Sequence, residues 1–175
     1  TALAALQEID AGLAATAPRS SAPAAAGGSP AEVVVVAEKL ELDPSLKLET
    51  RIASAVLEVD MPGTADEPLR SKPAAVAGRV ATLGFKHAFA AGAGTNLHAA
   101  LAAALQSDDQ ADSEIQLYVY AVDAKDGERE LGMAAVSLEA LLEKGADHGL
   151  GAVAVKDAKG VEVGQLTVAV TALAA

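Results

Sequence analysis

Alternation of apolar and polar residues at period two is the feature that most constrains the fold of this chain. It is clearest in VGQLTVAVTAL (163–173), where Leu166, Val168 and Val170 are separated by polar residues or alanine. Such alternation is typical of a strand with one buried face, because successive side chains of a strand point to opposite faces. Comparable segments, each bounded by turn residues, occupy residues 33–42, 51–61, 79–89 and 114–122.

Two short segments interrupt the strands with helical spacing. TNLHAALAAALQS begins at Thr95, a good N-cap residue, and SLEALLEKG begins at Ser137 and ends at Gly145, a typical residue just past a helix. We expect both helices to cross between strands. The pattern therefore predicts an all-β domain, an antiparallel eight-stranded β-sandwich with two short crossover helices.

The first 30 residues differ from the remainder. Apolar side chains recur there at helical spacing, at Leu3, Leu6, Ile9 and Leu13. A linker rich in Pro, Gly, Ala and Ser follows, so we divide the chain into 1–30, an amphipathic helix plus linker, and 31–175, the β domain. The leader is either a flexible tether or a helix that docks on a partner or on the domain. Because the chain begins with Thr1, we expect it to be part of a longer or processed protein.

Composition argues against several classes of function. A formal charge of −11, with no basic patch and only two Phe and two Tyr, disfavours nucleic-acid binding. The absence of cysteine removes disulfides, thiolate zinc sites and thiol nucleophiles, and it fits an intracellular setting. No apolar run approaches the ~20 residues of a membrane-spanning helix, and the N-terminus lacks the layout of a signal peptide.

Motifs for catalysis or ligand binding are also lacking. SDDQADSE (107–114) lacks the spacing of an EF-hand, and AGAGTNL (91–97) lacks the lysine of a P-loop, so we interpret both as turns or loops. The three histidines, His87, His98 and His148, fall on a predicted strand, a helix and a loop, with no paired metal-ligand spacing; His87 is expected to be half-buried. No nucleophile elbow or carboxylate pair stands out, so the sequence predicts a protein that is not an enzyme and carries no cofactor.

Several segments, in this order, resemble a C2 domain, the sandwich best known for calcium-dependent lipid binding. They are VVVVAEKLELDP, ASAVLEVDMP, TLGFKHAF and YAVDAKDGERELGMAAVSL. The LDP turn, the strand that ends in Asp-hydrophobe-Pro and the F-x-H strand are closest to the C2 domain of the retinitis pigmentosa GTPase regulator-interacting protein family. This resemblance covers residues 31–175. It implies a ciliary protein whose C2 domain binds other proteins.

The resemblance also implies where calcium ligands belong, and this sequence departs from that pattern. Two loops of a C2 domain supply several aspartates, and here the first loop offers Asp43 but Arg51 near its second position. The other loop offers Asp123, then Lys125 and Arg129 where carboxylates are expected. Each unit charge would repel another by about 4 kcal/mol at about 4 Å and an effective dielectric constant near 20, doubled for a divalent ion. We therefore predict no metal site, although Asp126 and Glu128 would enter the pattern in a shifted alignment.

Tyr118 and Tyr120 lie on the predicted outward face of one strand, where they are a possible protein interface, since tyrosine is enriched at interfaces. The leading hypothesis is a calcium-independent protein-interaction or structural module of a ciliary scaffold or axonemal protein, located in the cytoplasm at the transition zone or axoneme of a cilium or flagellum. Its expected partners are other ciliary proteins, such as a GTPase-regulator β-propeller, and neither nucleic acid nor a membrane is expected as a partner. The alternative is a peripheral membrane-binding C2 domain that depends on calcium or phospholipid.

Overall fold

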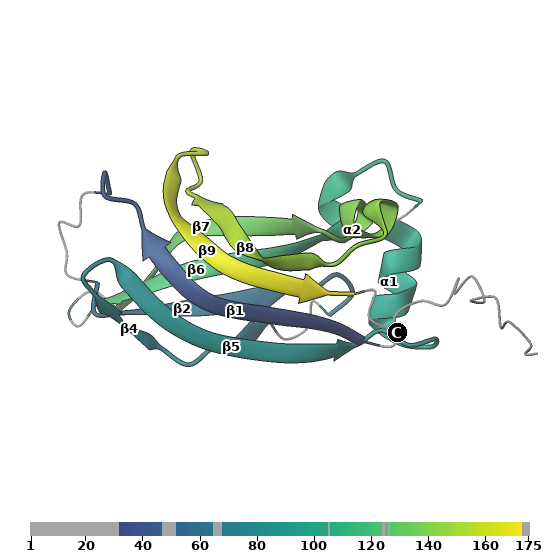
Figure 1. Cartoon of the computed structure of the whole chain (residues 1–175), viewed down its shortest axis with the longest axis horizontal. Helices are drawn as coiled ribbons and strands as arrows, with labels where there is room; N and C mark the ends of the chain where they lie inside the picture. The colour runs from purple at the N-terminus through teal and green to yellow at the C-terminus, as the bar shows by residue number, and fades with distance from the viewer. Residues whose placement is uncertain are drawn as a thin grey trace, which may run out of the picture.

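The computed structural model of the chain describes residues 32–46, 52–64, 68–104, 106–123, 125 and 127–172 (Figure 1). The predicted helix and linker of residues 1–30 lie outside these ranges, so the proposed division of the chain stays a prediction. The described part contains β1 (Glu32–Leu42), β2 (Ser54–Asp60), β3 (Leu69–Arg70), β4 (Ala74–Ala77), β5 (Val80–Ala90), α1 (Asn96–Ala104), a 3-10 helix (Gln110–Ser113), β6 (Glu114–Asp123), β7 (Gly127–Ser137), α2 (Leu138–Lys144), β8 (His148–Lys156) and β9 (Glu162–Thr171).

All strand pairs are antiparallel, as predicted, but the strands do not form two separate sheets. Their order is β3-β2-β4-β5-β1-β9-β8-β7-β6, and β2 also pairs with β6. Eight strands therefore close into a flattened barrel, and the two-residue strand β3 is added to β2. The expectation of a simple sandwich is corrected here, because short pairings join the two layers at their edges: β2 with β4 through Ala55 and Ala74, and β7 with β8 through Met133 and Lys156.

Gly132 permits one of these edge junctions. A Cβ atom at this position would lie 2.5 Å from the carbonyl oxygen of Lys156 on β8. That distance is too short for any side chain, so β7 can approach β8 this closely only with glycine. The register of β7 against β6 also shifts between Val119 and Tyr120, as at a β-bulge. A bulge bends its strand, which helps β7 to reach β8 at this edge.

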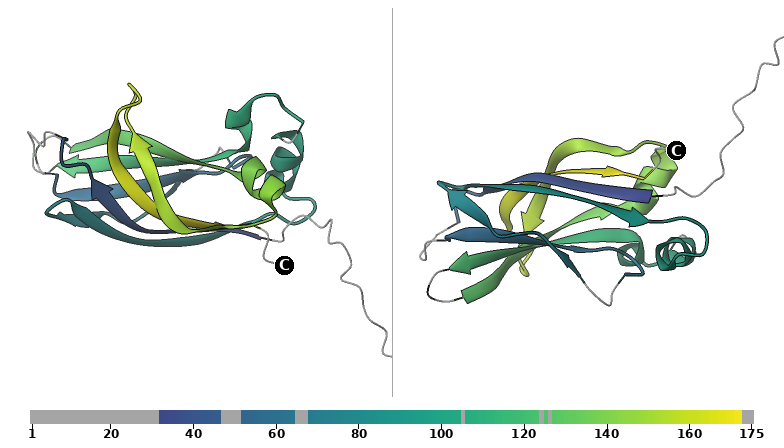
Figure 2. Two further views of the ribbon diagram at one scale, coloured as in Figure 1. Left: turned by 45° about the horizontal axis from the view of Figure 1, so that its top comes forward. Right: turned by 90° about the horizontal axis from the view of Figure 1, so that it is seen from below.

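The strands surround one interior (Figure 2). A single cluster of buried apolar side chains forms the core there. The alternation seen in the sequence supplies it, since Leu166, Val168 and Val170 of β9 are completely buried. On β6 the buried positions include Leu117 and Val119, and the intervening residues are half-buried on the outer face. Each large apolar side chain that leaves water contributes about 1.5–3 kcal/mol, so the alternation fixes which face of each strand points inward.

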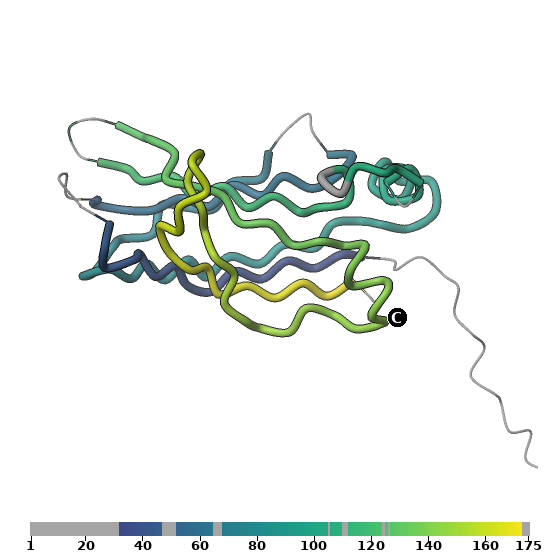
Figure 3. Tube along the Cα trace, turned by 90° about the horizontal axis from the view of Figure 1, so that it is seen from above, coloured from purple at the N-terminus to yellow at the C-terminus, as the bar shows by residue number. Residues whose placement is uncertain are grey.

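Both helices begin where the sequence predicts, and α2 also ends at the predicted glycine. The backbone N–H of His98 donates to the hydroxyl of Thr95, and that of Ala140 donates to the hydroxyl of Ser137, both at 3.2 Å. Gly145 ends α2 in the left-handed conformation. In Figure 3, α1 lies at the end of the barrel opposite the β6–β7 hairpin. Neither helix is long and apolar enough to cross a bilayer, which holds for the described residues.

Two histidine positions differ from expectation. His148 is the first residue of β8, not part of a loop, because it pairs with Val170 at the end of β9. His87 lies on β5 as predicted, but its side chain is exposed, and its ring centroid lies 4.7 Å from that of Phe89 in an edge-to-face arrangement. The reason is that β4 pairs with β5 only through Val80 and Ala81, so no further described strand covers the rest of that edge.

Candidate functional site

Asp43, the first degenerate calcium-loop position, closes the turn that follows β1. Its Oδ1 atom accepts a hydrogen bond from the backbone N–H of Ser45 at 2.7 Å and a second from the Ser45 hydroxyl. The hydroxyl contact and then the backbone contact hold the pKa of the Asp43 carboxyl below its usual value. One carboxylate oxygen is thus already bound within its own turn.

A cation also reaches this turn. Arg79, in the turn between β4 and β5, donates from Nη1 to the carbonyl oxygen of Asp43 at 2.5 Å, and Leu42 donates its N–H to the Arg79 carbonyl at 2.8 Å. Sequence reasoning missed Arg79, since it is 36 residues from Asp43 and only the strand pairing brings the two together. Arg51, the predicted cation of this loop, lies outside the described residues.

Asp123, like Asp43, stabilises the turn that it begins, here the turn of the β6–β7 hairpin. Its Oδ1 atom accepts the backbone N–H of Lys125 at 3.0 Å, a pattern typical of an Asx turn. The side chains of Lys125 and Arg129 are both exposed at this end of the barrel. Across the described residues, no three His, Asp or Glu side chains are close enough to hold a metal ion. The absence of calcium binding stays a prediction.

The two tyrosines lie on the outer face of β6, where they alternate with buried residues. The Tyr118 hydroxyl donates to Oε1 of Gln116 at 2.6 Å. The Tyr120 hydroxyl lies 3.5 Å from Oε1 of Glu58 on β2, and the guanidinium of Arg70 lies 5.1 Å from the Tyr120 ring centroid. A cation at this distance over an aromatic face is attracted to it.

Arg70 connects three strands on this face. Its Nε atom is 3.2 Å from Oε2 of Glu58, and Nη2 forms an ion pair with Glu128 of β7. We call the surface formed by Glu58, Arg70, Tyr118, Tyr120 and Glu128 the tyrosine face. Sequence reasoning did not find Arg70 or Glu58, because Arg70 belongs to a two-residue strand that has no periodic signal. Glu128, a shifted calcium ligand in the sequence-based alignment, is instead paired with Arg70.

Burial and neighbouring carboxylates raise the pKa of both tyrosine phenols. Partial burial, followed by the charges of Asp60, Glu130 and Glu58, raises the pKa of Tyr118. The pKa of Tyr120 is raised by burial and by Glu58 and Glu130, although Arg70 opposes this. Both phenols therefore stay neutral donors near neutral pH, and they lie in a negative electrostatic environment.

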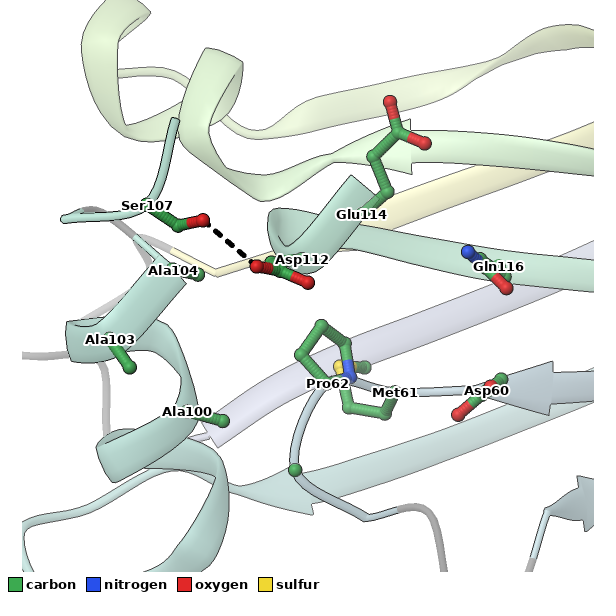
Figure 4. Close-up of a pocket in the computed structure, with 11 residues that line it drawn as sticks. Asp60, Met61, Pro62, Ala100, Ala103, Ala104, Ser107, Asp112, Glu114 and Gln116 are labelled. Atoms are coloured by element: carbon green, nitrogen blue, oxygen red, sulfur yellow. Dashed lines mark hydrogen bonds between the residues drawn. The ribbon is translucent and has the colours of Figure 1, made fainter. Parts of the chain in front are cut away.

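An acidic pocket of about 590 Å³ adjoins the tyrosine face at the α1 end of the barrel. Figure 4 shows Asp112 above Pro62, with Ala100, Ala103 and Ala104 on one side and Asp60 and Gln116 on the other. The lining also includes Met61, Gly63, Ser107 and Glu114, so it carries three carboxylates and no lysine or arginine. Gln116 connects the two surfaces, since it lines the pocket and accepts a hydrogen bond from Tyr118.

Two local contacts shape the acidic pocket. The Ser107 hydroxyl donates to Oδ2 of Asp112 at 2.9 Å, which joins the residues after α1 to the 3-10 helix. On the opposite wall the turn after β2 packs directly on α1, because a Cβ at Gly63 would be 2.5 Å from Cβ of Ala100. Gly63 also has a positive φ of 75°, which glycine adopts without strain.

Comparison with known proteins gives one family and a set of solved structures. Residues 32–175 match the family described as retinitis pigmentosa G-protein regulator interacting C-terminal. No curated protein matches the chain. One similar structure is a C2 domain-containing protein from a putative elicitor-responsive gene, with a TM-score of 0.56 and 15% identity; the match covers 85% of this chain and 93% of that one.

Two further structures share the fold. CC2D1B aligns with a TM-score of 0.61 at 10% identity, covering 82% of this chain and 55% of that one. The C2A domain of plant extended synaptotagmin 1 aligns with a TM-score of 0.50 at 11% identity, covering 81% and 93%. At these identities the similarity concerns the fold alone. The chain therefore has a C2-type fold and belongs to the retinitis pigmentosa G-protein regulator interacting C-terminal family.

Proposed function

We propose that this chain is a calcium-independent protein-interaction module of a ciliary scaffold or axonemal protein. The family match supports this proposal, since the family is described by its interaction with a G-protein regulator. The expected partner is accordingly the β-propeller of such a regulator or another ciliary protein. The tyrosine face is the surface that we assign to this contact.

The observation that carries the assignment is the arrangement of Tyr118 and Tyr120 on an outer strand face. Both side chains are half-buried and hydrogen-bonded to neighbours at 2.6 and 3.5 Å, so little side-chain entropy remains to be lost on binding. Tyrosine and arginine are the residue types that most often dominate binding energy at interfaces. Tyr120 and Arg70 are in contact here, and such a pair offers an aromatic ring and a planar charged group on one rigid surface.

The calcium-independent part of the proposal rests on the turns at the β6–β7 end of the barrel. Asp43 and Asp123 each accept a backbone N–H of their own turn, and Arg79 and Lys125 bring positive charge near them. Calcium requires six to eight oxygen ligands, which these two carboxylates do not supply. The module has no catalytic role in this proposal, and the alternative is a C2 domain that binds membranes with calcium or phospholipid.

The first experiment measures binding of the regulator's β-propeller by isothermal titration calorimetry, with Tyr120→Ala as the test variant. The matched control is Leu150→Ala, because Leu150 is an apolar side chain of β8 that is 53% exposed. We expect Tyr120→Ala to weaken binding at least tenfold, or about 1.4 kcal/mol. Equal affinities of the wild type and both variants would show that the contact lies elsewhere, and an absence of binding would refute the proposed partner.

The second experiment separates protein binding from membrane binding. Calcium chloride is titrated into the chain by calorimetry, and liposomes that contain phosphatidylserine are sedimented with and without calcium. We expect no heat of calcium binding and no protein in the pellet, because the net charge of −11 repels anionic lipid. Calcium-dependent pelleting would instead favour the membrane-binding alternative.

A further inference from the structure

The acidic pocket brings together the carboxylates of Asp60, Asp112 and Glu114, and its lining contains no lysine or arginine. Glu58 and Glu128 are both paired with Arg70, and Glu41 is paired with Lys39. Asp60 and Asp112 form no ion pair with any described residue. The pocket thus combines a defined volume of about 590 Å³ with negative charge that the chain itself does not neutralise.

The walls of the pocket are apolar where its rim is charged. Ala100, Ala103 and Ala104 of α1 form one wall, and Met61 and Pro62 face them from the turn after β2 (Figure 4). Because Gly63 fits directly against Ala100, this turn and α1 hold each other at a fixed separation. A flat or aliphatic group can therefore pack between the walls while its charged end meets the carboxylates.

We propose that the acidic pocket receives an arginine side chain of a protein partner. The guanidinium is planar, weakly hydrated on its faces and able to donate to two carboxylates at once, so it suits apolar walls and an acidic rim. Its aliphatic stem packs on alanine and proline, as long charged side chains do on apolar surfaces. This inference rests on the proposed protein-interaction function and specifies the chemistry of the contact.

The position of the pocket supports this occupant. Gln116 lines the pocket and accepts from Tyr118, so a partner that covers the tyrosine face extends onto the pocket without a gap. The negative charge of Asp60 also contributes to the raised pKa of Tyr118. Opposite charges across an interface accelerate association and fix the register of the partner. A basic partner surface is therefore the electrostatic complement of the tyrosine face together with the acidic pocket.

The test uses two peptides, acetyl-Ala-Arg-Ala-amide and the same peptide with citrulline, which keeps the shape of arginine and removes its charge. Each is titrated into the ¹⁵N-labelled full chain, and amide chemical shifts are recorded. We expect saturable shifts at Ala100, Ala104 and Gln116 with the arginine peptide, and shifts at least tenfold smaller at equal concentration with citrulline. Equal responses to both peptides, or shifts spread over all acidic surfaces, would overturn the proposal.

Matched variants then link the pocket to the partner. Asp60→Asn combined with Asp112→Asn removes two charges from the pocket, and Glu38→Gln combined with Glu162→Gln removes two from exposed positions of β1 and β9. We expect the first pair to weaken binding of the regulator's β-propeller about tenfold and the second about twofold or less. Circular dichroism checks that both variants are folded.

The outcomes distinguish this inference from the proposed function. If the propeller binds and the pocket variant retains full affinity, the arginine pocket is refuted while the interaction function stands. If the propeller does not bind, the proposed partner is refuted, and the peptide titration alone decides whether the pocket binds arginine.

Discussion

The two ends of the barrel both carry aspartates, yet these aspartates have different environments. At the β6–β7 end, Asp43 and Asp123 each accept a backbone N–H within their own turn, at 2.7 and 3.0 Å. At the α1 end, Asp60 and Asp112 line a pocket and form no ion pair with a described residue, although Asp112 accepts a hydrogen bond from Ser107. The comparison teaches that aspartates at the ligand positions of a family pattern can serve as acceptors within their own turns, while aspartates outside that pattern line a pocket.

The largest expected effect is on the free energy of unfolding, and it compares how tightly the two ends of the barrel are packed. Gly63→Ala introduces a Cβ 2.5 Å from Ala100, whereas Gly127→Ala in the β6–β7 hairpin meets nothing within 4 Å. Both glycines have positive φ, which costs alanine about 1 kcal/mol. Overpacking adds about 1–3 kcal/mol at Gly63 alone. Urea unfolding should therefore show a loss of about 3 kcal/mol for Gly63→Ala and about 1 kcal/mol for Gly127→Ala; equal losses would contradict the close packing against α1.

The next effect concerns the cation of the tyrosine face. Arg70→Met leaves Glu58 and Glu128 without their shared partner and removes the cation over Tyr120. Because the Arg70 side chain is 41% exposed, solvent screening limits the loss of unfolding free energy to about 1 kcal/mol. Lys125→Met, in the turn of the β6–β7 hairpin, is the control and should change stability by less than about 0.5 kcal/mol. The difference between the variants should shrink in 1 M NaCl, and a difference that is independent of salt would argue against an ion-pair origin.

A smaller effect on the free energy of unfolding is expected at alkaline pH. The pKa values of Tyr118 and Tyr120 are raised in the folded chain, so the folded state retains phenolic protons that the unfolded state has lost. This stabilising contribution is complete below the unfolded pKa of about 10 and is lost as pH rises through the folded pKa. Absorbance at 295 nm should show both phenols ionising later than free tyrosine. Asp60→Asn should move the titration of Tyr118 to lower pH, whereas an unchanged curve would exclude an influence of the pocket charge.

The smallest effect is expected at the turn of Asp43. Ser45→Ala removes the hydroxyl that donates to Oδ1, so the pKa of Asp43 should rise toward its ordinary value of 3.8. In the wild type, the lowered pKa means that the stabilising contribution is present above the unfolded pKa and is lost as pH falls through the folded one. Carbon-detected NMR titration of the carboxyl groups measures the shift. No change would mean that the backbone N–H alone sets the pKa.

Much of the fold is predictable from the sequence because period-two alternation and helix caps are local signals. The strand β9, the outward position of Tyr118 and Tyr120 and the caps Thr95 and Ser137 follow from them. The closure of the barrel does not, since it depends on two short edge pairings and on the close approach at Gly132. No local pattern marks such contacts.

The candidate surface is less predictable than the fold. Arg70 lies on a strand of only two residues, and its partners Glu58 and Glu128 are 12 and 58 residues away in the chain. The acidic pocket requires the turn after β2, α1 and the start of β6 to come together. Sequence reasoning considered residues 107–114 as a loop but had no means to place Asp112 near Asp60. Long-range pairing decides both features.

Hydrogen–deuterium exchange of the chain, free and bound to the regulator's β-propeller, tests most directly which end of the barrel meets a partner. Peptides that cover Asp60–Thr64, β3, α1 and β6 should gain protection in the complex. Peptides that cover Asp43–Leu46 and the tip of the β6–β7 hairpin between Asp123 and Gly127 should exchange at the same rate with or without the propeller, in calcium and in EDTA. Protection confined to Asp43–Leu46 and this hairpin tip, or protection that appears only with calcium, would contradict binding through the tyrosine face and the acidic pocket.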